Sequence, residues 1–158
     1  MKKLGVVIAM AIMAVAGHAQ TVFNVRAGGG RYIYTEEYGD SHGSACAVIA
    51  FEANISVNRT SRFVISPSAI VSRIVHRGEV ITVPLHFGYK IPFGKARLVP
   101  KVGPMATFVT SSSLREDSEA FGYSAELALE MKHFVVTANF QEDSFSNRGI
   151  FGTIGYRF

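Results

Sequence analysis

The chain has 158 residues, of which 48% are hydrophobic, with 15 glycines, no tryptophan and a formal net charge of +4. This length suggests a single domain, and the many glycines fit a strand-rich chain with frequent turns better than a helical bundle. The lysines and arginines are scattered without a basic run, which argues against a nucleic-acid-binding protein.

The first 19 residues are expected to be a cleaved signal peptide. Lys2 and Lys3 precede the apolar run LGVVIAMAIMAVAG, and small residues at Gly17 and Ala19 precede Gln20. The run is shorter than the ~20 residues of a membrane-spanning helix, so secretion is favoured over a retained anchor helix. We therefore expect residues 20–158 to leave the cytoplasm as one domain.

Eight segments after residue 20 alternate between apolar and polar residues and are separated by turn-forming residues, which predicts antiparallel strands. Each is long enough to cross a bilayer, for which a tilted strand needs about 9–11 residues. Cys46 is the single cysteine, so no internal disulfide stabilises the domain. The predicted strands are 22–34, 45–57, 62–74, 79–91, 96–109, 120–131, 133–143 and 148–158.

The two faces of these strands differ in polarity, as in 79–91, where Val83 and Phe87 alternate with Thr82 and His86. The apolar face is almost free of charge, as lipid requires, because a charge at mid-membrane depth costs roughly 2–4 kcal/mol. We therefore expect apolar residues outside and polar residues inside. The inner face carries charges of both signs that are expected to form an interior polar network: Arg26, Glu52, Lys101, Glu126, Glu130 and Arg157.

The predicted connections alternate in length. Residues 36–44 and 111–119 form long polar loops, whereas 58–61, 92–95 and 131–133 form tight turns. Short periplasmic turns and longer extracellular loops are typical of outer-membrane barrels, so both termini are expected in the periplasm. The two long loops are then available to an extracellular or complex partner. Aromatic residues near strand ends predict two interfacial girdles: Tyr32, Tyr34, Phe63, Tyr89, Phe93, Phe108, Phe121, Phe134, Tyr156 and Phe158.

The chain ends with the alternating segment RGIFGTIGYRF. Ile150 and Ile154 are expected to face lipid, and Thr153 is expected to face the interior with Arg157. Pairing of this last strand with the first one would close the sheet and remove its free edges.

The segment VITVPLHFGYKIPFGKARLVPKVGPMATF resembles the central signature of a small outer-membrane β-barrel domain common in Bacteroidetes, broadly OmpA-like. Pro84, Leu85 and Tyr89 match a strand before the turn, and Gly103 with Pro104 matches the strand after it. Thr82 stands where the family often has Glu. The resemblance implies a barrel without shared catalytic residues. At the C-terminus, Tyr156 and Phe158 resemble the signal read by the barrel-assembly machinery.

Two weaker patterns point to chemistry. Asp40, Ser41, His42, Ser44 and Cys46 are residue types that lipid-modifying outer-membrane barrels use, but residues this close in sequence seldom reach catalytic geometry, and polar loops have this composition by default. His42, His76 and His86 lack the spacing of a metal site, so we expect no metal and no cofactor. Gly28, Gly29 and Gly30 lack the lysine and helix of a phosphate loop and indicate close strand packing instead.

The sequence therefore predicts an all-β protein: an eight-stranded antiparallel up-and-down transmembrane β-barrel, monomeric and without enzymatic activity, in the outer membrane. Its partners would be outer-membrane lipid and, during insertion, the barrel-assembly machinery. The interior of such a barrel is just wide enough for side chains to fill, so a plugged lumen is expected. Three alternatives stay open: a secreted lipocalin-like ligand-binding barrel, a lipid-modifying enzyme of the outer membrane, and an accessory subunit of a secretion or uptake complex.

Overall fold

The computed structural model describes residues 20–35, 41–56, 61–75, 78–109, 119–144 and 146–158. The proposed signal peptide therefore lies outside the described residues. The strands are β1 (Gln20–Thr35), β2 (Ser41–Ser56), β3 (Phe63–Ile74), β4 (Gly78–Tyr89), β5 (Ile91–Phe93), β6 (Ala96–Val109), β7 (Glu119–Glu130), β8 (Phe134–Asp143) and β9 (Arg148–Arg157). No helix in these ranges is both long and apolar enough to cross a membrane.

The strands form a closed antiparallel barrel. β1 pairs with β9 as well as with β2, and β4 pairs with β6, so the sheet has no free edge along these strands. β4 and β5 pair with β6 in one continuous register, from Val80 opposite Val109 to Ile91 opposite Leu98. They are two parts of one barrel strand interrupted at Lys90. The predicted eight-stranded barrel is thus confirmed.

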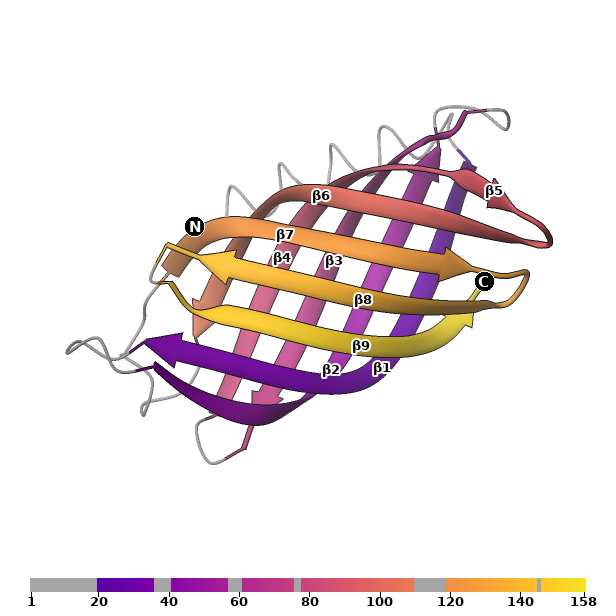
Figure 1. Ribbon diagram of the computed structural model, residues 1–158. Helices are drawn as coiled ribbons and strands as arrows, with labels where there is room; N and C mark the ends of the chain where they lie inside the picture. The colour runs from indigo at the N-terminus through magenta and orange to yellow at the C-terminus, as the bar shows by residue number, and fades with distance from the viewer. Residues whose placement is uncertain (1–19, 36–40, 57–60, 76–77, 110–118, 145) are drawn as a thin grey trace.

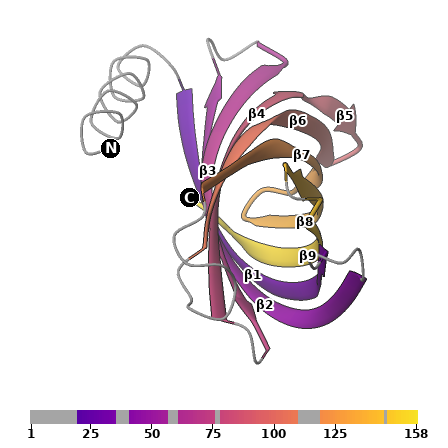
Figure 2. The same ribbon diagram turned by 90° about the vertical axis from the view of Figure 1, so that its left-hand side faces the viewer.

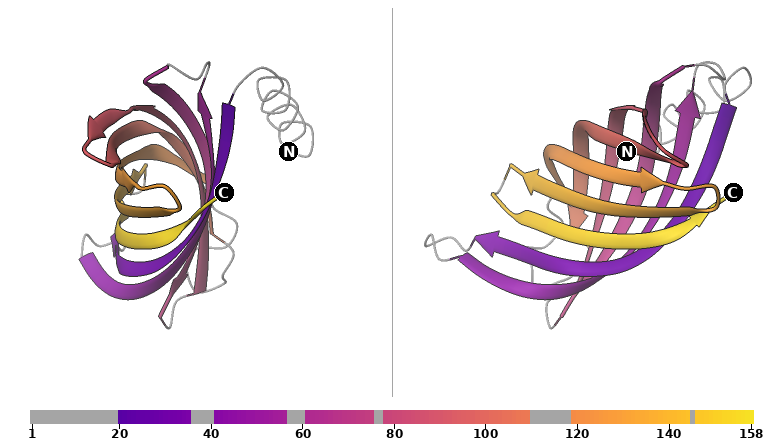
Figure 3. Two further views of the ribbon diagram at one scale, coloured as in Figure 1. Left: turned by 90° about the vertical axis from the view of Figure 1, so that its right-hand side faces the viewer. Right: turned by 45° about the vertical axis from the view of Figure 1, so that its right-hand side comes forward.

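The strands are strongly tilted. Figure 1 shows β6 to β9 running obliquely across β2, β3 and β4 of the opposite wall. Figures 2 and 3 show β6 to β9 curving over that wall, so that the two walls enclose the interior. This tilt is the geometry that closes a sheet into a small barrel.

The two ends of the barrel differ. One end holds Gln20, Phe158, the two-residue turn at Gly94 and Lys95, and the connection 131–133, and we call it the turn-side end. Gly94 has a φ of +59°, which L residues with side chains rarely adopt, so glycine suits this tight turn. The opposite, loop-side end joins β1 to β2, β3 to β4, β6 to β7 and β8 to β9.

At the loop-side end, strands extend further than the sequence predicts. Residues 41–44, expected to be loop, belong to β2, where His42 pairs with Tyr34 and Ser44 with Tyr32. Glu119 likewise begins β7 and pairs with Phe108. These polar segments remain strands because cross-strand pairing satisfies their backbone groups whether or not a side chain is apolar. The remainders of the two predicted loops, 36–40 and 111–118, lie outside the described residues, as do 58–60 of the first predicted turn.

The predicted orientation of the faces is confirmed. Large apolar side chains such as Phe51, Val102 and Ile154 are exposed on the outside, whereas their polar neighbours in sequence are buried inside. Tyr32 and Tyr34 correct the predicted girdle, because both are buried in the interior. They share the parity of Asn24 and Arg26 along β1, and parity decides the face before distance from the strand end does.

The interior is not polar throughout. Towards the loop-side end, β1, β2, β3, β4 and β9 contribute an apolar cluster, whereas β6 and β8 contribute buried polar residues such as Thr107, Gln141 and Asp143. The cluster is formed by Tyr32, Tyr34, Cys46, Val48, Ala50, Ile70, Ile74, Val80 and Phe151. A second apolar cluster consists of Val64, Val99, Ala128 and Val135. The charged residues lie in the same lumen.

Candidate functional site

Four buried charges form the central ion cluster: Arg26, Glu52, Lys101 and Glu126. Arg26 Nη1 donates to Glu126 Oε2 at 2.8 Å, and Arg26 Nη2 lies 3.2 Å from Glu52 Oε2. Lys101 Nζ lies 3.0 Å from Glu126 Oε1 and also pairs with Glu52. Two cations therefore alternate with two carboxylates in a closed, charge-balanced ring.

Each of the four residues lies on a strand at a position whose side chain points into the barrel, because successive side chains of a strand point to opposite faces. Arg26 lies on β1, Glu52 on β2, Lys101 on β6 and Glu126 on β7, so the cluster ties opposite walls of the barrel together. Burial of a single charge without partners is prohibitively costly, and the reciprocal pairing offsets much of that cost. The balance of charges explains how four ionised side chains share one narrow lumen.

The other two predicted interior charges form a separate pair at the turn-side end. Arg157 Nη1 donates to Glu130 Oε2 at 2.7 Å, and Asn54 Nδ2 donates to Glu130 Oε1 at 3.3 Å. Nearby, Lys90 Nζ donates to Ser56 Oγ at 2.5 Å. The six residues that the sequence predicts as one network are thus all in the interior but divide, by direct contact, into a group of four and a group of two.

Neutral polar residues extend both groups, and the sequence prediction left them out of the site. Asn24 donates to Glu52 at 3.3 Å, and Asn139 donates to Glu126 at 3.4 Å and to Ser124 at 3.2 Å. Ser124 Oγ also lies 3.0 Å from His86 Nε2. All of them share the inward parity of the charges, so parity is the signal that could have found them.

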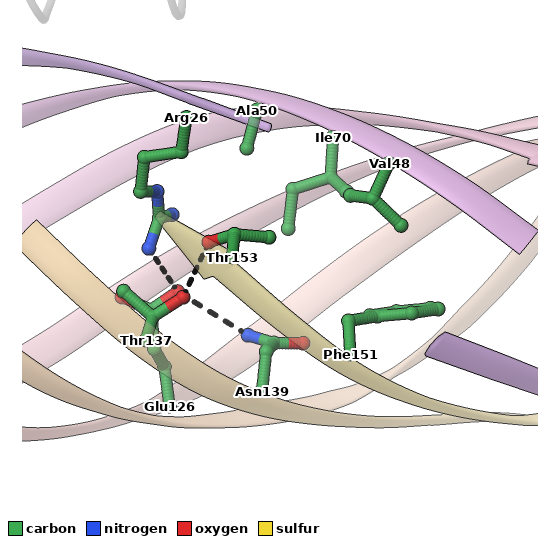
Figure 4. A pocket seen from close by; sticks show the side chains of 9 residues that line it. All are labelled: Arg26, Val48, Ala50, Ile70, Glu126, Thr137, Asn139, Phe151 and Thr153. Carbon is green, nitrogen blue, oxygen red and sulfur yellow. Dashed lines mark hydrogen bonds and ion pairs between the residues drawn. The ribbon is translucent and has the colours of Figure 1, made fainter. Parts of the chain in front are cut away.

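A small cavity borders the central ion cluster (Figure 4). Its volume is about 10 Å³, which is room for one water molecule. Two buried polar atoms at this cavity, Arg26 Nε and Asn139 Oδ1, have no protein partner. Thr137 and Thr153, which also line the cavity, bond to each other through their hydroxyls, 2.6 Å apart. The lining is completed by Val48, Ala50, Ile70, Glu126 and Phe151.

The residues that suggested catalysis or metal binding are dispersed. His42 is exposed and stacks on Tyr34 with ring centroids 5.8 Å apart, whereas Cys46 is buried as a free thiol in the loop-side apolar cluster. His86 lies in the lumen against Ser124. Asp40 and His76 lie outside the described residues. Within the described part of the chain, no group of three His, Cys, Asp or Glu side chains gathers to hold a metal ion.

The C-terminal aromatic residues lie on the outer surface of the turn-side end. Tyr156 and Phe158 are exposed, and their rings contact each other edge to face at a centroid distance of 5.0 Å. The backbone N–H of Phe158 donates to the carbonyl of Phe23 at 2.9 Å, which holds the chain end against β1. The aromatic pair is therefore both fixed in position and accessible.

The fold resembles that of small outer-membrane barrels of known structure. Ail of Yersinia pestis, an attachment invasion locus protein, matches with a TM-score of 0.54 and 12% identity over 88% of this chain and 99% of Ail. Neisserial surface protein A matches with a TM-score of 0.54 and 12% identity over 85% and 95% of the two chains. The N-terminal barrel domain of Pseudomonas aeruginosa OprF matches with a TM-score of 0.53 and 11% identity over 89% of this chain and 99% of the OprF domain. Neither a protein-family model nor a curated protein sequence matches the chain.

Proposed function

We propose that this chain is a non-enzymatic integral outer-membrane β-barrel that serves as a membrane-embedded scaffold with a plugged lumen. One observation carries the proposal: the polarity is reversed relative to a water-soluble protein. Val102 and Ile154 are 58% and 61% exposed outside, whereas Arg26 and Glu126 are 2% and 4% exposed inside. Water disfavours an apolar surface of this extent, whereas hydrocarbon accommodates it. The fold shared with Ail, Neisserial surface protein A and OprF supports the same location.

The proposed topology follows from the two ends of the barrel. Residues 1–19 act as a signal peptide, both termini face the periplasm, and the loop-side end faces outwards. Tyr156 and Phe158, accessible on the outer surface, are read by the barrel-assembly machinery during insertion. The loops around 36–44 and 111–119 offer the surface for an extracellular or complex partner, and the Bacteroidetes-type signature is part of this proposal. A closed sheet leaves no strand edge for pairing with a second copy, which supports a monomer.

The interior supports a scaffold better than a ligand carrier. A lipocalin-type carrier needs a ligand cavity of roughly 300–1,000 Å³. Here the central ion cluster and the two apolar clusters fill the lumen, and the cavity beside Arg26 holds about 10 Å³. No contact of His42 or Cys46 in the described residues favours an enzyme, because one is stacked on Tyr34 and the other is buried.

Membrane fractionation combined with heat-modifiable gel migration tests the proposal. We expect the protein in the outer-membrane fraction, extractable only with detergent, and migrating faster before boiling than after it, since folded barrels resist SDS. A monomer that stays in solution without detergent would contradict the proposal and favour the lipocalin-type alternative.

A further inference from the structure

The turn-side end of the barrel carries an excess of positive charge. Among the described residues, this end has six cationic side chains and one carboxylate side chain, Glu130. The loop-side end, counted in the same way, has three cations (Arg31, Arg73 and Arg148) against four carboxylates (Glu79, Glu119, Glu142 and Asp143). The asymmetry therefore belongs to one end and not to the chain as a whole. The six turn-side cations are Arg62, Lys90, Lys95, Arg97, Lys132 and Arg157.

Among the described residues, the contacts at this end leave most of the cationic side chains without a carboxylate partner. The carboxylate of Glu130 pairs with Arg157. Lys90 and Arg62 donate instead to neutral hydroxyl oxygens, those of Ser56 at 2.5 Å and Tyr89 at 3.3 Å. In these contacts neither Lys90 nor Arg62 is paired with a carboxylate.

Exposed aromatic side chains border the same end. Phe63 packs edge to face on Tyr89 at 5.1 Å, and Phe134 packs in the same way on Tyr156 at 6.2 Å. His133 stacks on Tyr156 at 5.8 Å. Aromatic rings of this kind lie at the boundary between hydrocarbon and headgroups. The exposed cations at this end consequently lie at the depth of the lipid headgroups, whereas Lys90 and Arg157 face the lumen. The exposed ones are Arg62, Lys95, Arg97 and Lys132.

We propose that the turn-side end binds anionic phospholipid headgroups of the membrane leaflet that it meets. The ligand has to present an anion to the cations and an apolar chain to the adjacent aromatic rings, and an anionic phospholipid has both. The inference rests on the proposed membrane location. It adds that the bound headgroups are anionic and that they belong to the leaflet at the turn-side end. The membrane location alone requires neither.

Native mass spectrometry of the folded protein from mixed micelles of phosphatidylglycerol and phosphatidylcholine tests the proposal. The test variant is Lys95→Gln/Arg97→Gln/Lys132→Gln, in which all three positions are exposed. The matched control, Arg31→Gln/Arg73→Gln/Arg148→Gln, removes three exposed cations from the loop-side end. Each cation near an anionic surface strengthens binding about fivefold. We expect preferential retention of phosphatidylglycerol by the wild type and the control, and at least about a tenfold weaker preference in the test variant.

The outcomes separate this inference from the proposed function. Heat-modifiable barrels that retain both lipids equally, or a test variant indistinguishable from the control, would overturn the headgroup assignment and leave the membrane proposal intact. A wild-type protein that folds without any amphiphile would overturn the membrane proposal itself. Displacement of phosphatidylglycerol by inorganic phosphate, but not by sodium chloride of equal ionic strength, would assign the cations to free phosphate and overturn the lipid assignment.

Discussion

Arg26 and Glu126 are separated by 100 residues in sequence, yet Arg26 Nη1 donates to Glu126 Oε2 at 2.8 Å in the middle of the barrel. Their strands, β1 and β7, are not neighbours in the sheet but are separated by β9 and β8. The bond therefore crosses the lumen rather than following the wall. Together with Lys101 and Glu52 it connects four strands through their side chains.

The first prediction concerns this bond. Glu126→Gln leaves Arg26 and Lys101 with a single carboxylate, Glu52, and removing one partner of a buried ion pair costs about 3–5 kcal/mol. We expect urea unfolding in lipid vesicles to shift to clearly lower denaturant concentration. Glu142→Gln is the control, because it removes an ion pair whose Arg148 side chain is 54% exposed. Equal midpoints for the two variants would show that the central ion cluster does not stabilise the barrel.

The second prediction distinguishes lipid from water at the outer surface. Val102 lies in the central part of β6 and faces outwards. In a bilayer, Val102→Arg should reduce the free energy of unfolding by roughly 2–4 kcal/mol. At an exposed position of a water-soluble barrel, the same substitution would change the free energy of unfolding by no more than about 0.5 kcal/mol. The measurement is the free energy of unfolding at equilibrium in lipid vesicles, and Val102→Leu is the apolar control.

The third prediction compares two glycines at the junction of β1 and β9. A Cβ added to Gly30 would lie 1.9 Å from the carbonyl oxygen of Ile150, whereas one added to Gly152 meets nothing within 4 Å. Gly30→Ala should therefore force the strands apart and cost about 1–3 kcal/mol. Gly152→Ala should be neutral in the same unfolding assay. Similar stabilities would mean that the junction is not as tightly packed as the structure has it.

The fourth prediction concerns conduction. The two apolar clusters, which include Val64 and Val99, share the lumen with the buried charges and neutral polar side chains. A hydrated ion cannot pass through an interior packed with side chains without losing its hydration, so we expect no steady single-channel steps in planar bilayers. Regular, large conductance steps from purified protein would contradict a plugged lumen.

The fifth prediction concerns the chain end. Phe158 is 71% exposed, and the bond that holds it to Phe23 uses its backbone N–H. Phe158→Ala should therefore leave stability in vesicles close to that of the wild type. If the assembly machinery reads this side chain, the same variant should reach the outer membrane of cells several-fold less efficiently. Parallel losses in both assays would instead indicate a structural role.

The sequence predicts well whatever depends on local alternation. A strand places successive side chains on opposite faces, so parity separates Glu52 from Phe51, and the lack of charge on the apolar face indicates that Phe51 points outwards. Boundaries follow less well, because backbone pairing and not side-chain polarity extends a strand. For this reason Ser41 and His42 belong to β2, although their polarity suggests a loop.

The interruption at Lys90 escapes prediction for a related reason. It depends on neighbours that are remote in sequence. The backbone N–H of Lys90 donates to the carbonyl of Arg62 across the sheet. Local patterns contain no information about which neighbours these are.

The amino-acid sequence by itself determined the strands, their two faces and the set of charges that point inwards, because each follows from a period of two along a single segment. Only the tertiary structure decided which charges meet. Closure of β1 on β9 and the tilt of the strands bring Arg26 opposite Glu126 and leave Arg157 with Glu130. Such pairing depends on register and tilt around the whole barrel, and these are properties of the closed sheet rather than of any one strand.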